Sequence, residues 1–193
     1  MDITLLLTQQ EKDYLHERSL FKGETLFHEN ERCECIGIVH SGRIRIVSYL
    51  SDGKEVIYNE LAKDEIFGNN LLFSSDPFYK GNIVSLTDTS LYLLYKEDLL
   101  KILHENPQFL MAYLEIQSDF SKTLNARIRL LSIADSEERF LLYMHTHKKE
   151  ITYVSISELS KQLYMQRETL SRLLSRLEKE KKIQRFNKHI RLL

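Results

Sequence analysis

The sequence is poor in the residues that mark several specialised protein classes. Among 193 residues it has 2 cysteines and no tryptophan, and no apolar stretch approaches the ~18 residues of a membrane-spanning helix. Cys33 and Cys35 stand one residue apart, so a bridge between them would be strained and would close almost no loop. The chain opens with Met1-Asp2, without the basic flank and cleavage site of a signal peptide. We therefore expect a cytoplasmic globular protein with no disulfide framework and no membrane partner.

Neither sign of charge is in excess over the whole chain. The 27 Lys+Arg nearly balance the 28 Asp+Glu, which argues against a histone-like polycation and against an acidic disordered chain. The balance hides a division, because residues 150–193 hold ten basic against five acidic residues and residues 1–149 hold 17 against 23. Basic charge at one end favours a polyanionic partner, although a charged run is more often a solvated face.

Glycine is scarce and unevenly distributed. All six glycines lie within the first 81 residues, so turn chemistry is concentrated there. Short apolar or alternating runs between them predict β-strands, and Asp52-Gly53 predicts a type I′ turn with two residues at positive φ. A small barrel or jelly roll follows from many short antiparallel strands. The expected strands are 25–28, 35–39, 44–50, 56–61, 83–86 and 91–95.

After Pro107 the pattern becomes that of a long helix. Apolar residues recur there at alternating spacings of four and three, as in a heptad seam, without Gly or Pro for three heptads. Such a seam favours pairing with a second copy of the chain, and the alternative is a helix that packs only on its own domain. The expected interface residues are Leu110, Leu114, Gln117, Ser121, Leu124, Ile128 and Leu131.

The basic end contains the pattern of a helix-turn-helix. Ser155 and Glu158 form a capping box, which predicts a helix through Leu163, a break at residues 164–166 and a second helix from Arg167 or Glu168. Leucines at 170, 173, 174 and 177 give the second helix an apolar face, whereas its opposite face is polar. An ordinary amphipathic surface helix is the alternative. The tail, residues 182–193, alternates on either side of Asn187-Lys188 and predicts a hairpin that would serve as a wing.

The sequence resembles the Crp/Fnr family of bacterial transcription regulators in the order of its elements. These are a roll with glycines between its strands, a seam helix, a helix-turn-helix with the sequence Gln166-Arg167-Glu168-Thr169-Leu170-Ser171-Arg172, and a wing. Supporting motifs are Gly23-Glu24-Thr25-Leu26-Phe27-His28, Ile38-Val39-His40-Ser41-Gly42, Asp52-Gly53-Lys54-Glu55, Ile66-Phe67-Gly68, Asn106-Pro107 and Asp135 near an interdomain hinge. The resemblance covers nearly the whole chain. One departure is Tyr164, where the family turn often has glycine, so we expect a different turn conformation there.

The resemblance implies an α+β chain with a cyclic-nucleotide-binding-like jelly-roll β-barrel (1–106), a dimerisation helix (107–134) and a winged helix-turn-helix (135–193). It implies a homodimeric regulator, not an enzyme, that binds double-stranded DNA at a palindromic operator with TGA-containing half-sites. Glu168 and Arg172 correspond to the pair that reads the inner bases, Arg167 matches the cyclic-AMP type and Ser171 the Fnr type. Bases are expected to contact Arg167, Glu168, Ser171 and Arg172, and phosphates to contact Ser157, Arg185, Lys188 and Arg191.

The resemblance also locates an effector pocket, whose candidate residues are Gly68, Asn69, Tyr79, Lys80, Ser121, Leu124 and Asn125. Cyclic-AMP-binding members have a Gly-Glu pair for the ribose and an Arg-Ser pair for the phosphate. Here the matching pairs are Gly68-Asn69 and Tyr79-Lys80, and tyrosine lacks the charge and fork of a guanidinium. We therefore expect an effector other than cyclic AMP. An iron-sulfur cluster held by one subunit needs four thiolates and is excluded by two cysteines.

Three other readings stay open at the level of sequence. Cys33 and Cys35 could hold a soft metal with His28 or His40, although two small semi-buried residues are the more common meaning of such a pair. A non-DNA interaction scaffold and a cupin-like metal enzyme are the alternative functions, but the histidines never have cupin spacing. RNA polymerase is a candidate partner, although the segment between about His147 and Ser155 is shorter than the polymerase-touching loop of cyclic-AMP-binding relatives. The effector, the target genes and the sign of regulation are not readable.

Overall fold

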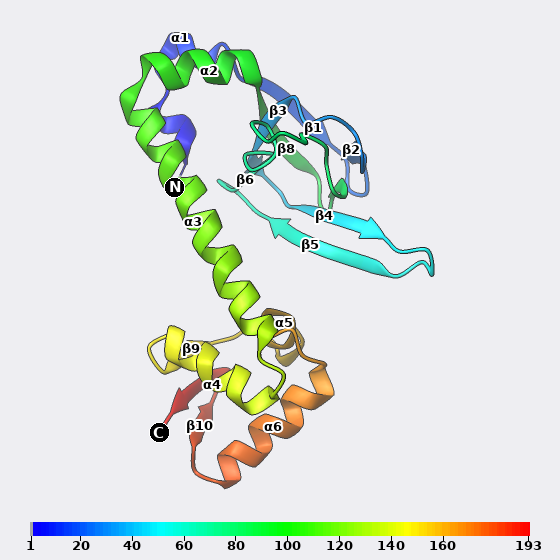
Figure 1. Cartoon of the computed structure of the whole chain (residues 1–193), viewed down its shortest axis with the longest axis vertical. Coiled ribbons are helices and arrows are strands. Elements are labelled where there is room, and N and C mark those ends of the chain that lie inside the picture. The colour runs from blue at the N-terminus through cyan, green and yellow to red at the C-terminus, as the bar shows by residue number, and fades with distance from the viewer. Residues whose placement is uncertain (1) are drawn as a thin grey trace. The chain divides into compact units, whose positions relative to one another are not determined.

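A computed structural model describes residues 2–193, and Figure 1 labels most of its helices and strands along the chain. The chain forms two compact units, one that extends to Ser118 and one that comprises Asp119–Leu193. The predicted α+β class and the predicted order of elements are confirmed. None of the helices in the described residues is long and apolar enough to cross a membrane.

The first unit contains a roll of two four-stranded antiparallel sheets. One sheet has the strand order β1-β8-β3-β6 and the other the order β2-β7-β4-β5. The predicted strands are all present, and the two strands that the sequence pattern missed are β1, which is mostly polar and exposed, and the two-residue β6. The bounds are β1 His16–Leu20, β2 Thr25–Phe27, β3 Cys35–Ser41, β4 Ile44–Tyr49, β5 Glu55–Leu61, β6 Ile66–Phe67, β7 Asn82–Ser85 and β8 Thr89–Tyr95.

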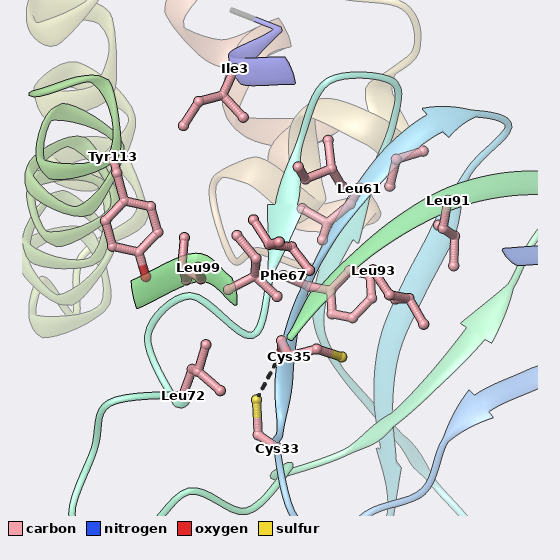
Figure 2. Close-up of a cluster of buried hydrophobic side chains, with 14 of the residues drawn as sticks. Ile3, Cys33, Cys35, Leu61, Phe67, Leu72, Leu91, Leu93, Leu99 and Tyr113 are labelled. Carbon is pink, nitrogen blue, oxygen red and sulfur yellow. Dashed lines mark hydrogen bonds between the residues drawn. The ribbon is translucent and has the colours of Figure 1, made fainter. Parts of the chain in front are cut away.

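The core of the roll lies around β3, whose first five residues are all buried (Figure 2). Gly37 is required there by close packing, because a Cβ at this position would lie 1.9 Å from Cζ of the Phe67 ring. The Phe67 ring, 2% exposed, thus covers the strand directly. Leu91 and Leu93 of β8 contribute to the same cluster from the neighbouring strand.

The β4–β5 turn differs from the prediction. A type I′ turn needs two residues at positive φ, but only Gly53 has one (φ +80°). The Gly53 N–H donates to Leu50 O at 2.9 Å, and Leu50 N–H donates to Lys54 O at 2.9 Å, so three residues form the loop. A longer loop in which one glycine takes the left-handed conformation is the next most common hairpin connection.

The helices of the first unit surround the start of the long helix α3 (Pro107–Ser132). Asn106 precedes it, and its side chain accepts from Phe109 N–H at 3.0 Å while donating to Leu6 O and to the Glu11 carboxylate, each at 3.0 Å. Proline suits the first helical position because its missing N–H would have no partner there. The preceding elements are the 3-10 helix η1 (Ile3–Leu6), α1 (Gln9–Lys12) and α2 (Lys96–Glu105).

The second unit has its own core. Eleven buried residues, among them Phe140 and Met144 of α4 and four leucines of α6, form one apolar cluster. The three-stranded sheet has the order β10-β11-β9, and β9 lies in the segment that the sequence pattern treated as a connection. The bounds are α4 Ser136–Thr146, β9 Glu150–Thr152, α5 Ile156–Gln162, α6 Arg167–Lys179, β10 Ile183–Phe186 and β11 His189–Leu192.

Candidate nucleic-acid interface

The helix-turn-helix begins at the predicted serine cap. Ser155 Oγ accepts from Glu158 N–H at 3.1 Å, which satisfies one of the amides that the first turn of α5 leaves without a helical partner. This bond is the serine half of the predicted capping box. Ser157, a predicted phosphate contact, is exposed in the same first turn. The N-terminal end of α5 is therefore capped and accessible.

The turn between the two helices is a Schellman motif built on Tyr164. Tyr164 N–H donates to Lys161 O at 3.1 Å, and Met165 N–H donates to Ser160 O at 2.9 Å. Tyr164 itself has φ +52°. The expectation that tyrosine would impose another turn conformation is wrong: Tyr164 takes the left-handed conformation that glycine usually supplies here.

The recognition helix α6 separates an apolar face from a polar one. Leu170, Leu174 and Leu177 are completely buried and Leu173 is 5% exposed. The four predicted base-contact residues all lie on the exposed side within the first turn and a half: Arg167, Glu168, Ser171 and Arg172. The Arg172 Nε donates to Glu168 O over 3.4 Å, too long to hold the guanidinium firmly. The structure thus brings this set together and leaves its side chains accessible.

An open hollow of about 500 Å³ continues along the same helix. Ser171 and Arg172 belong to its wall, so the hollow is continuous with the predicted base-contact set. Arg176 was not predicted as part of this surface. The full lining is Ser171, Arg172, Ser175, Arg176, Lys179 and Glu180.

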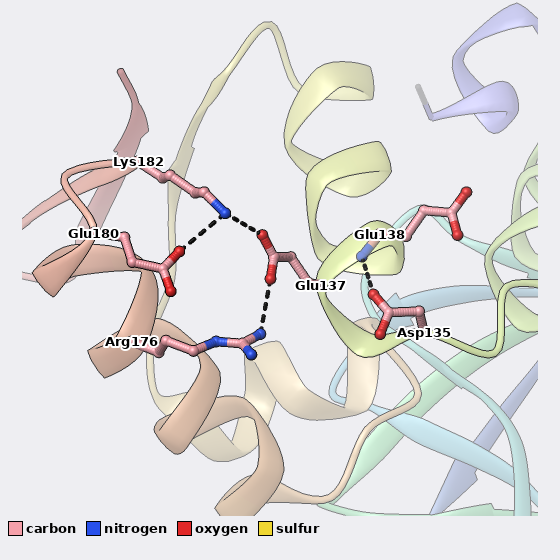
Figure 3. A network of polar contacts seen from close by, with 6 residues as sticks. All are labelled: Asp135, Glu137, Glu138, Arg176, Glu180 and Lys182. Atoms are coloured by element: carbon pink, nitrogen blue, oxygen red, sulfur yellow. Dashed lines mark hydrogen bonds and ion pairs between the residues drawn. The ribbon is translucent and has the colours of Figure 1, made fainter.

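Arg176 is held by an ion-pair network at the C-terminal end of α6 (Figure 3). Glu137 Oε2 lies 2.8 Å from Arg176 Nη2, and Glu137 Oε1 lies 2.7 Å from Lys182 Nζ. Lys182 also pairs with Glu180 at 2.9 Å. The carboxylates of Glu137 and Glu180 raise the pKa of Lys182, and the Lys182 ammonium lowers the pKa of Glu180. This end of the helix is therefore less available to an anion than its beginning.

The wing is a tight hairpin, as predicted. Phe186 pairs with His189, and the two loop residues Asn187 and Lys188 have φ +43° and +64°. Positive φ at both positions is the requirement of a type I′ turn. Lys188 lies at the tip of the hairpin and is exposed.

The three wing cations that we predicted to bind phosphate do not share one face. Arg185 pairs across the hairpin with buried Ile190, whereas Arg191 pairs with exposed Gln184. Arg185 forms an ion pair with Glu178 that lowers the pKa of that carboxyl group. Arg191 Nη2 lies 3.1 Å from Glu150 Oε1 on β9. The sequence offered no periodic signal for these carboxylate partners, because each pair joins different elements.

The predicted seam is largely exposed along α3. Leu114 is 49% exposed, Leu124 46%, Ile128 57% and Leu131 49%; Ser121 is also exposed, and Leu110 is half-buried. Gln117 is different. Its Nε2 donates to Asn69 O at 2.8 Å, and its Oε1 accepts from Asn69 Nδ2 at 3.1 Å. Gln117 therefore uses its amide within its own unit, and its place in a dimer interface stays a prediction.

The predicted effector residues of the roll are already engaged. Asn69, 5% exposed, is bound to Gln117, and Tyr113 Oη donates to Asn69 O at 3.4 Å. Tyr79, 2% exposed, stacks on Phe27 with ring centroids 5.0 Å apart, and burial raises the pKa of its phenol.

Of the remaining effector candidates, Gly68 is also buried in the core of the roll, whereas the others are exposed. Gly68 has φ +78°, and a Cβ on it would lie 2.7 Å from Cys35 O. Lys80 is exposed and pairs with Asp76 at 2.6 Å. Ser121, Leu124 and Asn125 are exposed on the part of α3 that belongs to the second unit.

The two cysteines are free thiols in the core of the roll (Figure 2). Cys33 Sγ donates to Cys35 O at 3.4 Å. Burial raises the pKa of both thiols, that of Cys35 to about 12, so neither is a ready nucleophile. No group of three His, Cys, Asp or Glu side chains within residues 2–193 could hold a metal ion.

Comparison with known proteins accounts for both units. The family model of the cyclic nucleotide-binding domain matches residues 17–106, and that of the Crp-like helix-turn-helix domain matches residues 138–193. The chain belongs to the Crp/Fnr family. Members of this family are transcription regulators rather than enzymes, and this regulator has the arrangement of a β-rich domain, a long helix and a helix-turn-helix that defines the fold.

Individual relatives of this Crp/Fnr regulator are distant. The Anaerobic regulatory protein of Bacillus subtilis (strain 168) is 27% identical over 113 residues, which are 58% of this chain and 48% of that protein, so the match spans about half of the relative. The catabolite activator protein of Thermus thermophilus is 21% identical with a TM-score of 0.58 and covers 100% of this chain and 94% of its own. A CooA mutant from Carboxydothermus hydrogenoformans is 20% identical with a TM-score of 0.71, covering 99% and 90%. These structures establish the shared fold.

Proposed function

We propose that this regulator is a homodimer that binds a palindromic operator and reads a TGA-containing half-site with each α6. The observation that carries the proposal is the exposed polar face at the N-terminal end of α6, opposite four leucines that anchor the helix in its core. A helix presented in this way can enter the major groove with its first residues against the base edges. The cytoplasm, where DNA is accessible, is the expected location.

The chemistry of the exposed residues fits base reading. Arg172 can donate two hydrogen bonds to guanine O6 and N7, and Glu168 can accept from cytosine N4. Both kinds of contact are available at the guanine-cytosine pair of TGA. Arg167 and Ser171 would add contacts at flanking positions. The accessibility of all four side chains supports this reading.

The exposed apolar residues of α3 support the homodimer. Leu124, Ile128 and Leu131 lie on one side of a single helix at heptad spacing and are each about half exposed. A second copy of the same helix is the simplest surface that would cover them, because a two-fold axis matches a seam with itself. Two-fold symmetry of the protein then requires inverted half-sites, with centres separated by about one helical turn of DNA or a multiple of it.

The roll supports control by an effector other than cyclic AMP. Where the resemblance puts a glutamate for the ribose, Asn69 is tied to Gln117, and where it puts an arginine for the phosphate, Tyr79 is packed into the core. Lys80 remains at the surface in an ion pair with Asp76. The residues present therefore do not fit a cyclic nucleotide phosphate.

The proposal is tested by selecting binding sites from random duplex DNA with the full chain. We expect enrichment of two inverted TGA-containing half-sites, and a complex with two chains per duplex by analytical ultracentrifugation. Arg172→Ala should relax the choice of base at one position of each half-site. Recovery of no common sequence, or of a single unpaired half-site bound by one chain, would refute the proposal and favour the interaction scaffold.

A further inference from the structure

Tyr164 occupies a backbone conformation that is costly for its residue type. Its φ of +52° lies in the left-handed region, where Cβ crowds the backbone and where bulky residues are uncommon. The Schellman turn between α5 and α6 needs this conformation whichever residue is present. Glycine would meet the requirement without strain. The side chain of Tyr164 therefore has to be explained by what it contacts.

The ring of Tyr164 lies against the long helix α3. Arg127 of that helix places its guanidinium carbon 4.9 Å from the centre of the Tyr164 ring. This separation is within the ~6 Å range of a cation–π interaction, which is strengthened when the pair is partly withdrawn from water. Arg127 and Tyr164 are both half-buried. A glycine at position 164 could make the turn but not this contact.

A second arginine, Arg139, connects the end of α3 to the turn before α6 by hydrogen bonds to backbone carbonyl groups. Arg139 of α4 donates from Nη1 to Tyr164 O at 2.8 Å and from Nε to Ile133 O at 3.0 Å. Ile133 directly follows the last residue of α3. One guanidinium thus bridges the end of the long helix and the turn before the recognition helix. All of these groups lie within the compact unit Asp119–Leu193.

We propose that Tyr164 is a positioning residue: together with Arg127 and Arg139 it clamps the helix-turn-helix to the C-terminal part of α3, so that α6 keeps a fixed orientation relative to the dimer helix. The affinity consequence rests on the proposed DNA-binding function. In a two-fold dimer both recognition helices must match the spacing of two half-sites at once. A loose joint would lower the fraction of dimers in the matching orientation, and the apparent affinity falls by that fraction.

The decisive substitution is Tyr164→Gly, because it separates fold stability from positioning. Glycine removes the strain of the left-handed residue, and this gain opposes the lost ring contact and the larger entropy of the unfolded chain, so the melting temperature of the second unit should change little. Loss of the ring contact should nevertheless weaken operator binding by about three- to thirtyfold. Tyr164→Phe is the matched control, since it keeps the ring and should bind like the native chain. A merely structural role for Tyr164 predicts that affinity and melting temperature fall together.

A double-mutant cycle tests whether Arg127 is the partner. Arg127→Gln should weaken binding by a similar factor, and adding Tyr164→Gly should cause little further loss, because the shared contact is already gone. The salt slope and the preferred sequence should be unchanged in all variants. A smaller salt slope in Arg127→Gln, or additive losses in the cycle, would overturn the clamp and indicate direct DNA contacts instead.

Amide hydrogen exchange without DNA gives an independent readout. Residues 133–135 connect α3 to α4, and their exchange should be faster in Tyr164→Gly than in the native chain or in Tyr164→Phe. Unchanged exchange in Tyr164→Gly would overturn the clamp even if affinity fell. Failure of the native chain to bind any duplex would instead refute the proposed function, and the exchange measurement would still decide the positioning role.

Discussion

The exposed seam of α3 allows the cost of disrupting the proposed dimer to be worked out. Leu124 is 46% exposed and Ile128 57% exposed in the single chain, so about half of each side chain is left to be covered. Complete burial of Leu or Ile stabilises by about 1.5–3 kcal/mol, which gives roughly 1 kcal/mol for each half-exposed side chain. Two positions in two chains give about 4 kcal/mol, and alanine would retain part of it. The double variant Leu124→Ala, Ile128→Ala should therefore lose about 3 kcal/mol of association free energy, a roughly hundredfold rise in the dimer dissociation constant.

Sedimentation velocity over a series of protein concentrations measures this change directly. Circular dichroism of the same samples should show an intact fold, because both side chains are largely exposed within one chain and alanine favours helix. Leu100→Ala is the matched control, since Leu100 is 49% exposed on α2, outside the seam. A native chain that stays monomeric at micromolar concentration would refute the reasoning. An equal loss of association in Leu100→Ala would show that the interface lies elsewhere.

Three further predictions follow from the described residues. Isothermal titration with cyclic AMP should show no binding at physiological concentration, and a micromolar dissociation constant would mean that Asn69 and Tyr79 have been misread. Arg172→Ala should lose about 1–3 kcal/mol of discrimination at one base pair, whereas Lys188→Ala should lower the affinity for all DNA sequences alike and reduce the salt slope by ~1. Binding selection at two salt concentrations separates these two effects. Reversed effects would contradict the placement of α6 in the groove. Iodoacetamide at pH 8 should modify Cys33 and Cys35 only after unfolding, because burial raises the pKa of Cys33 and raises that of Cys35 to about 12. Mass spectrometry with and without denaturant checks this expectation. Labelling of the folded chain would contradict it.

Regular patterns in the sequence predicted the parts of the fold that depend on local spacing. The apolar face of residues 170–177 predicted α6 because a helix repeats every 3.6 residues and four leucines match that period. Asn187-Lys188 predicted the wing turn because the flanking residues alternate. Asp52-Gly53 misled for the same local reason. That dipeptide fits a two-residue turn, but the hairpin extends its loop by one residue and leaves only Gly53 at positive φ.

The parts that could not be predicted depend on contacts between elements distant in the sequence. Gln117 fits the heptad spacing, and only the fold shows that Asn69, 48 residues earlier, takes its amide. Tyr164 looked incompatible with a glycine-type turn, because the steric cost of a tyrosine at positive φ follows from the residue type alone. The contacts of Tyr164 with Arg127 and Arg139 become apparent only in the folded structure. Strand β1 was missed because its side chains are mostly exposed, so no alternation marks it.

The ion pairs of the second unit change what its net positive charge means. Four cations already have carboxylate partners: Arg176, Lys182, Arg185 and Arg191. A paired cation gains less from binding a phosphate, because it must either leave its carboxylate partner or keep that carboxylate close to the phosphate, where the two negative charges repel each other. Among the described residues of this unit, exposed cations without such a partner include Arg167 and Arg172 at the start of α6, Lys188 at the tip of the wing, and Lys161, Lys179 and Lys181. Phosphates should therefore be attracted more strongly to these unpaired cations than to the four paired ones. The salt dependence of DNA binding should accordingly reflect the few unpaired cations, since each neutralised phosphate contributes about 0.9 to the slope.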